Sequence, residues 1–435
     1  MKRLWDLLCD ALKDNPVRFL IISGLIVRLF IFLIYQQITI FPDSSGYIEL
    51  AERLLSFNLE HYEGQRSPGY PALIFLSAGN LWVTVFIQMF LGVAASLYIY
   101  KTLLHLGFKH QKAVIISLAC STLMHVLFFE TAILTEAFTL FFISVAVYLI
   151  IKYFIYQHNF RKDILLSIIL AILVIAKPFY IYIPFVIYGL YIMYKFTFRK
   201  IFSRKLVVFV LPLVSFLGWS AVNLHNTGYF TSTTFYGFNM AQNCVSFAEG
   251  VPDKYAPIRD IYVKHRDIAI RENKDVAMSI WYAYDELKSV TQLPFPELSH
   301  ELSLYAKEAI SGNPGGYAKQ VLVSWLAFWN TEIHWDYYNF ALPYSNKFMA
   351  VIWLVQKMIL LAAKFIFVLL MPYYIYLWFR NKKITPVLII VCIVLATSLL
   401  QAVATYGNNS RFSFPFEYMM VAVVLYTFRK PLRLA

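Results

Sequence analysis

Residues 164–195 of the chain, ILLSIILAILVIAKPFYIYIPFVIYGLYIMYK, decide how it is organised. Apart from its last residue, the stretch carries a single charged side chain, Lys177, directly before Pro178. Proline interrupts a helix and disfavours helical geometry in the residue before it, so the stretch predicts two helices that meet at Lys177 and Pro178. Each helix is short for a membrane span, about 20–25 Å at the usual rise per residue, which places Lys177 below a membrane surface and facing a cavity. A lysine in that position needs a partner, and a phosphate would serve.

The composition of the whole chain agrees with this stretch. Of its 435 residues, 60% are hydrophobic and only 14% are charged, whereas a water-soluble protein of this length needs more charge to cover its surface. Aromatic residues make up 18% of the chain, which is typical of a protein with many membrane interfaces. The net charge of +13 is spread over short clusters between apolar runs, without a nucleic-acid-binding motif. The composition therefore indicates a membrane protein with no nucleic-acid partner.

Apolar stretches long enough to form membrane helices recur along the chain. A bilayer core of about 30 Å is crossed by about 20 residues of helix. The first run contains Arg28 and lacks a small-residue cleavage site after it, so we interpret it as a retained span. The ten candidate spans are 17–36, 81–104, 112–129, 133–154, 164–177, 179–195, 205–223, 348–379, 385–405 and 414–428.

The charges between these spans follow the positive-inside rule. Alternate connectors are basic, for example at Lys109 and Lys112, and basic connectors are expected in the cytoplasm. The basic flanks of residues 164–195 therefore require the chain to enter the membrane and return. The loop over residues 225–346 carries nine basic and thirteen acidic residues and is expected outside. The ends of the chain are also basic, with Lys2, Arg3, Lys13, Arg18, Arg429, Lys430 and Arg433.

The predicted fold class is an all-α polytopic membrane protein of about ten transmembrane helices with an external loop domain at the membrane surface. Residues 1–224 form a transmembrane module that includes the first external loop, residues 225–346 the loop domain, and residues 347–435 the C-terminal transmembrane helices. We expect the protein in the plasma or inner membrane of the cell, with both termini in the cytoplasm.

Two motifs with charged side chains lie in the first external loop. Asp43 opens the sequence Asp43-Ser44-Ser45-Gly46-Tyr47 after the first span. It either caps a short amphipathic helix or serves as a carboxylate that removes a proton or binds a divalent cation. Arg66 precedes Ser67, Pro68 and Gly69, and is either a membrane-surface arginine or one that forks onto phosphate oxygens.

Further charged residues fall on the same predicted side. Glu130 and Glu136 bracket the turn between the third and fourth spans, and either can simply favour the positive end of the fourth helix. In so apolar a region both need a partner, water or a cation. Arg411 precedes the last span and, with Arg66 and Lys177, provides a cation suited to a lipid phosphate. A carboxylate opposite these cations suits a general base.

In order and sidedness, these motifs resemble those of the GT-C superfamily of polyprenyl-phosphate-sugar transferases, especially the branch with protein O-mannosyltransferases and lipid A aminoarabinose transferases. The resemblance runs from the first span to the last. It rests on Asp43 and Tyr47, Arg66 to Pro71, Thr135 and Glu136, Lys177, a segment with Trp219, Asn223, Thr227, Gly228 and Phe230, and finally Arg411, Phe412 and Pro415.

The resemblance implies an inverting glycosyl transfer outside the cytoplasm, from a polyprenyl-phosphate sugar in the membrane lipid to an acceptor of unknown class. It assigns Asp43 and Glu136 as catalytic carboxylates, with both as candidate ligands of a divalent metal ion. The resemblance also implies that a donor-phosphate site forms from Arg66, Lys177 and Arg411, which stabilise the departing phosphate. Further candidates are Glu130, Tyr47 and Tyr70.

The chain departs from the family pattern at its first acidic motif. A double-acid motif typical of protein mannosyltransferases is replaced here by Asp43-Ser44, which weighs against a protein acceptor. The histidines of the loop, His225, His265 and His334, have no metal-ligand spacing, so we interpret them as solvated or structural.

Two other functions remain open at this point. A polytopic transporter or lipid-linked-glycan flippase also needs many spans and buried cations, but it predicts repeated halves and little mass outside the membrane. A glycan polymerase or ligase uses external arginines too, but it transfers whole glycans from a diphosphate-linked donor.

Overall fold

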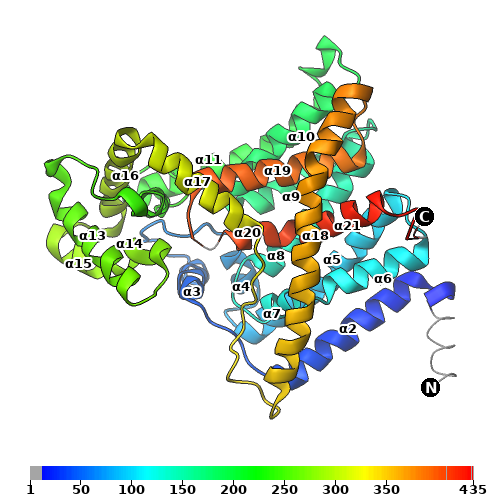
Figure 1. The fold of residues 1–435 in the computed structure, drawn as a ribbon, viewed down its shortest axis with the longest axis horizontal. Coiled ribbons are helices and arrows are strands. Elements are labelled where there is room, and N and C mark those ends of the chain that lie inside the picture. Colours follow the sequence, from blue (N-terminus) through cyan, green and yellow to red (C-terminus); the bar gives the residue numbers. More distant parts are fainter. Residues whose placement is uncertain (1–11, 408, 433, 435) are drawn as a thin grey trace.

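The computed structural model describes residues 12–407, 409–432 and 434. Over these residues the chain is helical, and its β-structure is limited to one isolated parallel bridge between Thr39 and Ala132. Lys2, Arg3 and Arg433, which contribute to the predicted orientation of the termini, lie outside the described residues. The helices form an elongated body with a smaller group of helices, α13 to α16, at one end (Figure 1).

Within the described residues, six helical segments are long and apolar enough to cross a membrane. A helix pair bent by 61°, α6 (His110–Ser121) and α7 (Met124–Glu130), would provide a seventh as one broken span. The six segments are α2 (Pro16–Tyr35), α5 (Leu81–His105), α8 with the π-helical turn η1 (Glu136–Phe154), the segment Phe198–Thr227 that contains α11 (Val207–Thr227), α18 (Ser345–Asn381) and α19 (Pro386–Ala404).

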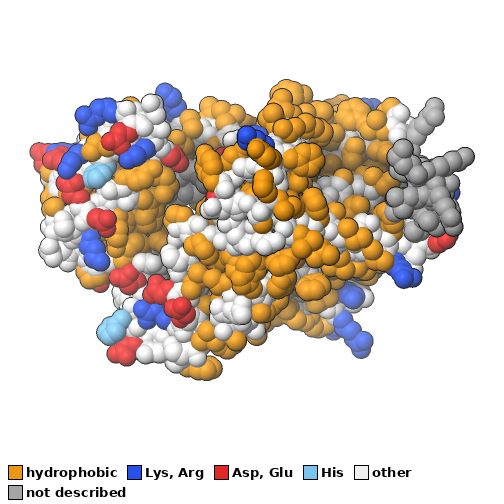
Figure 2. All heavy atoms as spheres, turned by 90° about the horizontal axis from the view of Figure 1, so that it is seen from below, with side chains coloured by type: hydrophobic (Ala, Val, Ile, Leu, Met, Phe, Trp, Pro, Cys, Tyr) orange, Lys and Arg blue, Asp and Glu red, His pale blue; other side chains and the backbone are white. Residues whose placement is uncertain are grey.

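All ten predicted ranges coincide with helices, but some of these helices are shorter than a membrane span. The short ones are α9 (Phe160–Ala176), the turn η2 (Pro178–Ile181) with α10 (Tyr182–Met193), and the turn η8 (Phe414–Phe416) with α21 (Glu417–Thr427). Hydrophobic side chains cover much of the surface of this bundle, whereas acidic and basic side chains gather at the end with α13 to α16 (Figure 2). The chain is an integral membrane protein, while the number of spans stays a prediction.

The predicted break at Lys177 is confirmed. Helix α9 ends at Ala176, and Lys177 has extended geometry with φ −140° and ψ 104° before η2 begins at Pro178. The proline has no N–H to continue the helix and disfavours helical geometry at the residue before it. The ammonium group of Lys177 is thereby carried at the end of a helix rather than along its side.

The loop domain has a hydrophobic core of its own. Phe238 stacks between Trp281 and Phe295, with ring centroids 4.4 and 4.9 Å away, and Tyr262 and Tyr305 are fully buried in the same core. The helices around it are α12 (Tyr236–Gln242), α13 (Ala256–Arg271), α14 (Ser279–Tyr282), α15 (Tyr284–Thr291) and α16 (Phe295–Gly312).

The last part of the predicted loop domain is attached to the membrane helices instead. Helix α17 (Pro314–Phe328) packs against α19, and the indole N–H of Trp325 donates to Ser398 Oγ at 3.2 Å. The separate core thus covers only the first part of residues 225–346.

The first loop between spans carries α3 (Pro42–Leu55) and α4 (Pro71–Leu76). It is tied to the start of the loop domain, because Thr234 Oγ1 donates to Glu63 O at 2.8 Å and Thr233 Oγ1 donates to Gln65 O at 2.7 Å. These bonds hold the segment before Arg66 against the loop domain.

Candidate active site

Asp43 lies in the first turn of α3 and accepts hydrogen bonds from two arginines. Arg66 Nη2 is 2.8 Å from Asp43 Oδ1, and Arg411 Nη1 is 2.6 Å from Asp43 Oδ2. The capping interpretation of Asp43 is wrong, because the hydroxyl of Ser44 caps this end of the helix by accepting from Phe41 N at 2.9 Å. The carboxylate of Asp43 is therefore available for other partners, and its side chain is 35% exposed.

Glu136 is the first residue of α8 and is fully buried. Its Oε1 accepts from Arg411 Nε at 2.9 Å and from Lys177 Nζ at 3.0 Å. The start of a helix favours a negative charge, but two full positive charges within hydrogen-bond distance are the stronger partners. Glu136 thus joins the end of α9 to the segment before the last helix.

Together, five predicted residues form one continuous chain of ion pairs, which we call the charged cluster: Arg66, Asp43, Arg411, Glu136 and Lys177. Three cations face two carboxylates, which leaves an excess of one positive charge. Burial by itself would raise the pKa of Asp43, but the charges of Arg411 and Arg66 outweigh it and hold that pKa well below its usual range. Asp43 is therefore ionised at neutral pH.

Aromatic rings hold Arg66 in place within the cluster. Its guanidinium lies 4.7 Å from the ring centroid of Tyr47 and 4.5 Å from that of Phe235 in the loop domain. The hydroxyl of Tyr62 donates to Arg66 O at 2.7 Å. Tyr47 thus borders the charged cluster, as predicted, and the loop domain contributes a wall to it through Phe235.

Tyr70, the other predicted tyrosine, packs against Tyr47 and so contacts the border of the charged cluster. Its ring packs edge-on against Tyr47 with centroids 5.1 Å apart, and its buried hydroxyl donates to Gln88 Oε1 at 2.9 Å. The hydroxyl thus bonds to α5 rather than to a member of the charged cluster.

Gly69 sets the distance between the first loop and the end of α9. Its N–H donates to Ile175 O at 2.8 Å, and a Cβ at this position would lie 2.5 Å from the backbone nitrogen of Ala176. Only a residue without a side chain allows this approach. The Pro68-Gly69 pair is thereby what brings Arg66 and Lys177 to the same site.

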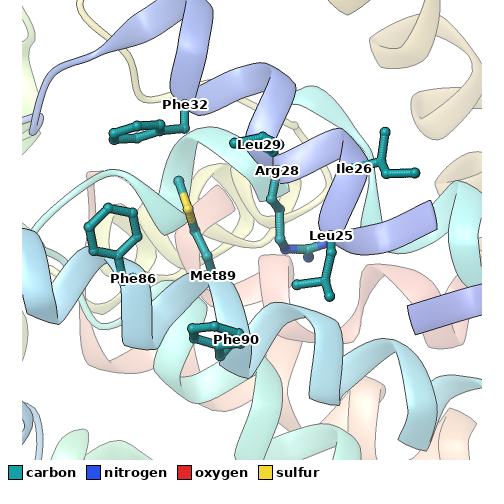
Figure 3. A pocket seen from close by; sticks show the side chains of 8 residues that line it. All are labelled: Leu25, Ile26, Arg28, Leu29, Phe32, Phe86, Met89 and Phe90. Atoms are coloured by element: carbon teal, nitrogen blue, oxygen red, sulfur yellow. The ribbon is translucent and has the colours of Figure 1, made fainter. Parts of the chain in front are cut away.

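Glu130, predicted as an additional candidate, lies outside the charged cluster. Its Oε1 is 2.6 Å from Arg28 Nη2, and both side chains are almost completely buried. Gly92 makes room for this pair, because a Cβ there would lie 1.8 Å from Glu130 Oε1. Arg28 reaches from α2 toward α5 (Figure 3). It lies beside an apolar cavity of about 310 Å³, lined also by Leu25, Ile26, Leu29, Phe32, Phe86, Met89 and Phe90.

The predicted metal ligands, Asp43 and Glu136, are engaged by protein cations. Arg411 bonds to both carboxylates, so a metal ion shared by them would have to displace its guanidinium. Among the described residues, His, Cys, Asp and Glu form no group of three with the spacing to hold a metal ion. This donor set does not fit a divalent ion in the arrangement of the structure.

Some residues around the site were not predicted. The ring of His334 stacks on Phe129 with centroids 4.8 Å apart and meets Phe41, two residues before Asp43, edge-on at 5.4 Å. Burial, reinforced by the nearby Arg411, lowers the pKa of His334 to about 4. Nothing in its sequence context distinguishes it from His225, which is exposed, because its position depends on how residues 329–344 return to the membrane helices.

A second buried ion-pair group, not predicted either, lies close to Arg411. Lys364 Nζ is 2.7 Å from Glu417 Oε1, and His125 Nε2 is 2.5 Å from Glu417 Oε2. The sequence offers only a weak signal for it, because Lys364 is one of three lysines in α18 and Glu417 is the single charged residue of α21.

Comparison with known proteins identifies the fold. No protein-family model and no curated protein sequence matches the chain. The archaeal oligosaccharyltransferase AglB from Archaeoglobus fulgidus, in complex with an inhibitory peptide and a dolichol-phosphate, is similar with a TM-score of 0.50 at 12% identity, over 97% of this chain and 51% of that one. An oligosaccharyltransferase from Archaeoglobus fulgidus tethered through a disulfide bond to an acceptor peptide with the NVT sequon gives 0.46 at 11%, over 98% and 51%.

The present chain thus spans about half the length of these enzymes. At such identity the likeness concerns the fold alone. It confirms the fold class predicted from the motifs: the chain has the GT-C fold.

Proposed function

We propose that the protein is an inverting glycosyltransferase that moves a sugar from a polyprenyl-phosphate donor to an acceptor on the extracytoplasmic side of the membrane. The observation that carries this proposal is the charged cluster, in which two acids and three cations from separate parts of a GT-C fold meet at one place. The proposal includes the predicted orientation, with both termini in the cytoplasm.

The charge of the cluster suits the donor. Its excess positive charge favours an anion, and Arg66, Lys177 and Arg411 together offer several N–H groups to phosphate oxygens. The apolar outer surface of the bundle lets a lipid tail remain in the bilayer while its phosphate reaches these cations. The related AglB structure is a complex with a dolichol-phosphate, which supports a lipid phosphate as the ligand here.

Asp43 is the better placed of the two acids for proton transfer. Its side chain is 35% exposed, whereas Glu136 is fully buried. In the proposed step the acceptor nucleophile attacks the anomeric carbon from the face opposite the phosphate. The bond from that carbon to the phosphate oxygen breaks, its electron pair stays on the phosphate, and the proton of the nucleophile passes to Asp43.

Binding of the donor also prepares Asp43 for this role. A phosphate that takes hydrogen bonds from Arg66 and Arg411 draws these cations away from the carboxylate. With less positive charge beside it, the pKa of Asp43 rises towards its usual value and the carboxylate becomes a stronger base. Glu136 keeps Lys177 and Arg411 in place during the exchange.

The test is Asp43→Asn in the purified protein, reconstituted into lipid nanodiscs and supplied with radiolabelled polyprenyl-phosphate sugars. We expect loss of sugar transfer, normal membrane insertion and retained binding of polyprenyl phosphate. Undiminished turnover of this variant would remove Asp43 from the mechanism.

A choice of donors separates the proposal from its alternatives. Polyprenyl-phosphate single sugars should be substrates, and diphosphate-linked glycans should not. Transfer from the diphosphate-linked glycans alone would indicate a polymerase or ligase. Movement of the intact donor between leaflets without sugar transfer would indicate a flippase.

A further inference from the structure

Arg411 lies in the first turn of the last helical segment. Helix α20 (Ser410–Ser413) has four residues and continues without a break into η8 and α21, and the end of a helix frays unless outside contacts hold it. Yet its arginine must bridge Asp43 and Glu136 with two hydrogen bonds of 2.6 and 2.9 Å. Contacts from neighbouring helices therefore fix where α20 places this arginine.

A polar contact that holds it comes from Lys364 in the middle of α18. Lys364 Nζ donates to Ser413 Oγ at 2.9 Å, and the Ser413 hydroxyl in turn donates to Ser410 O at 2.9 Å. The ammonium also bonds Asn330 O at 2.6 Å and Glu417 Oε1 at 2.7 Å. An ammonium has three N–H donors, so the buried Lys364 is fully used.

Glu417 connects this lysine to two further segments. Besides Lys364, it meets His125 Nε2 of α7 at 2.5 Å and accepts from Thr331 Oγ1 at 3.2 Å. The group of Lys364, Glu417 and His125, which we call the rear cluster, thus joins α18, α21, α7 and residues 330–331 around α20. Buried ion pairs contribute little net stability compared with apolar side chains, and charged residues inside a membrane bundle usually serve function.

The rear cluster and Arg411 also share a small polar cavity. It has a volume of about 10 Å³ and is lined by His125, Phe129, Glu332, His334, Ser410, Arg411, Phe414 and Glu417. The two clusters are therefore neighbours.

We infer that Lys364, Glu417 and His125 are positioning residues, which clamp α20 through Ser413 so that Arg411 is held ready for the donor phosphate. This inference rests on the proposed function, since it assigns a second group of residues to the same phosphate site. The rear cluster acts only through Arg411 and does not touch the substrate.

Ser413→Ala is the mildest test, because it removes the clamp and leaves every charge in place. The measurement is the affinity of the reconstituted protein for a short-chain polyprenyl phosphate, with the corresponding polyprenol as the uncharged probe. We expect roughly tenfold weaker phosphate binding, as for the loss of one hydrogen bond to a charged group. Polyprenol binding should stay the same.

The matched control is Ser117→Ala, which removes another buried hydroxyl bonded to a backbone carbonyl, Ser96 O at 2.5 Å, within α6 and α5. Both variants should lower the melting temperature by a similar few degrees, and only Ser413→Ala should weaken phosphate binding. Equal affinity in the two variants would overturn the inference.

A double variant, Lys364→Met with Glu417→Leu, separates positioning from folding. Replacing both members of a buried ion pair by apolar residues is often neutral for stability, whereas removing one is not. We expect the double variant to fold with nearly normal thermal stability and to bind polyprenyl phosphate about tenfold or more weakly. Full affinity in this folded variant would show that the rear cluster is only structural. If the unaltered protein does not prefer the phosphate over polyprenol, the proposed function itself fails.

Discussion

Two buried groups of ion pairs differ in one informative respect. Arg28 and Glu130 form a closed pair with equal and opposite charges, in which Arg28 also donates to Gly24 O and Ser121 O. The charged cluster has one cation more than it has acids, and Asp43 within it is 35% exposed. A buried pair whose charges cancel attracts an anion only weakly, whereas an open group with excess positive charge attracts one strongly. The comparison suggests that Arg28 and Glu130 serve folding and the charged cluster serves binding.

The largest expected effect is that of Arg411→Ala on the charged cluster. This change removes the cation shared by Asp43 and Glu136 and leaves two cations and two acids in the cluster, with no excess charge. Polyprenyl-phosphate affinity should fall by about 100-fold or more, because a bidentate, charge-assisted contact is lost. Arg411→Lys should recover only part of the affinity, since an ammonium lacks the planar fork. Titration of the reconstituted protein with polyprenyl phosphate measures both, and full affinity in Arg411→Ala would contradict the binding role.

The closed pair should respond in the opposite way. Glu130→Ala leaves Arg28 buried without its partner, which costs about 3–5 kcal/mol of stability for a broken buried pair. Thermal unfolding should therefore shift to lower temperature, while the protein that remains folded binds polyprenyl phosphate normally. The double variant Arg28→Met with Glu130→Met should regain most of the stability. A specific loss of phosphate affinity in this double variant would place the pair in the binding site after all.

Gly69→Ala tests how sharply the geometry of the charged cluster is set. The added methyl group would meet the backbone at Ala176, so the first loop has to move away from the end of α9. We expect Arg66 and Lys177 to separate and phosphate affinity to fall by roughly tenfold. Gly189→Ala is a suitable control, because a Cβ at Gly189 has no neighbour within 4 Å. An equal affinity of the two variants would show that the spacing matters little.

The smallest effect concerns pH. His334 next to the charged cluster has its pKa lowered to about 4, from an ordinary value of about 6.5. Between these values the unfolded chain binds a proton that the folded chain excludes, so stability falls as the pH is lowered from about 6.5 to about 4. The lowered pKa of Asp43 matters at lower pH. Its contribution to the stability of the folded protein is complete above the ordinary pKa of an aspartate and is lost as the pH falls below that value.

His334→Phe isolates this contribution, because the new ring can stack between Phe129 and Phe41 in the same place. Melting temperatures of the variant should depend less on pH between 7 and 5 than those of the unaltered protein. An unchanged dependence would mean that another group titrates in that range.

The helices and the candidate residues could be predicted to different extents. Each apolar range was found on a helix, and the break at Lys177 lies where the proline places it, since both depend on residues close in sequence. Asp43, Arg66, Glu136, Lys177 and Arg411 were predicted to converge, and they do. The capping role of Asp43 was not confirmed, because Ser44 takes it. Glu130 does not belong to the charged cluster, because its carboxylate pairs with Arg28 on α2.

By itself, the sequence determined that the chain is a helical membrane protein, where its helices break, and which side chains are charged inside an apolar setting. Hydropathy and proline geometry act over a few residues, so they can be recognised without a fold. Only the tertiary structure decided which acid meets which base: Glu136 and Arg411 are 275 residues apart, and Asp43 and Arg411 are 368 apart. Such pairings follow from helix packing, because an ion pair forms only where two backbones bring its members within a few ångströms.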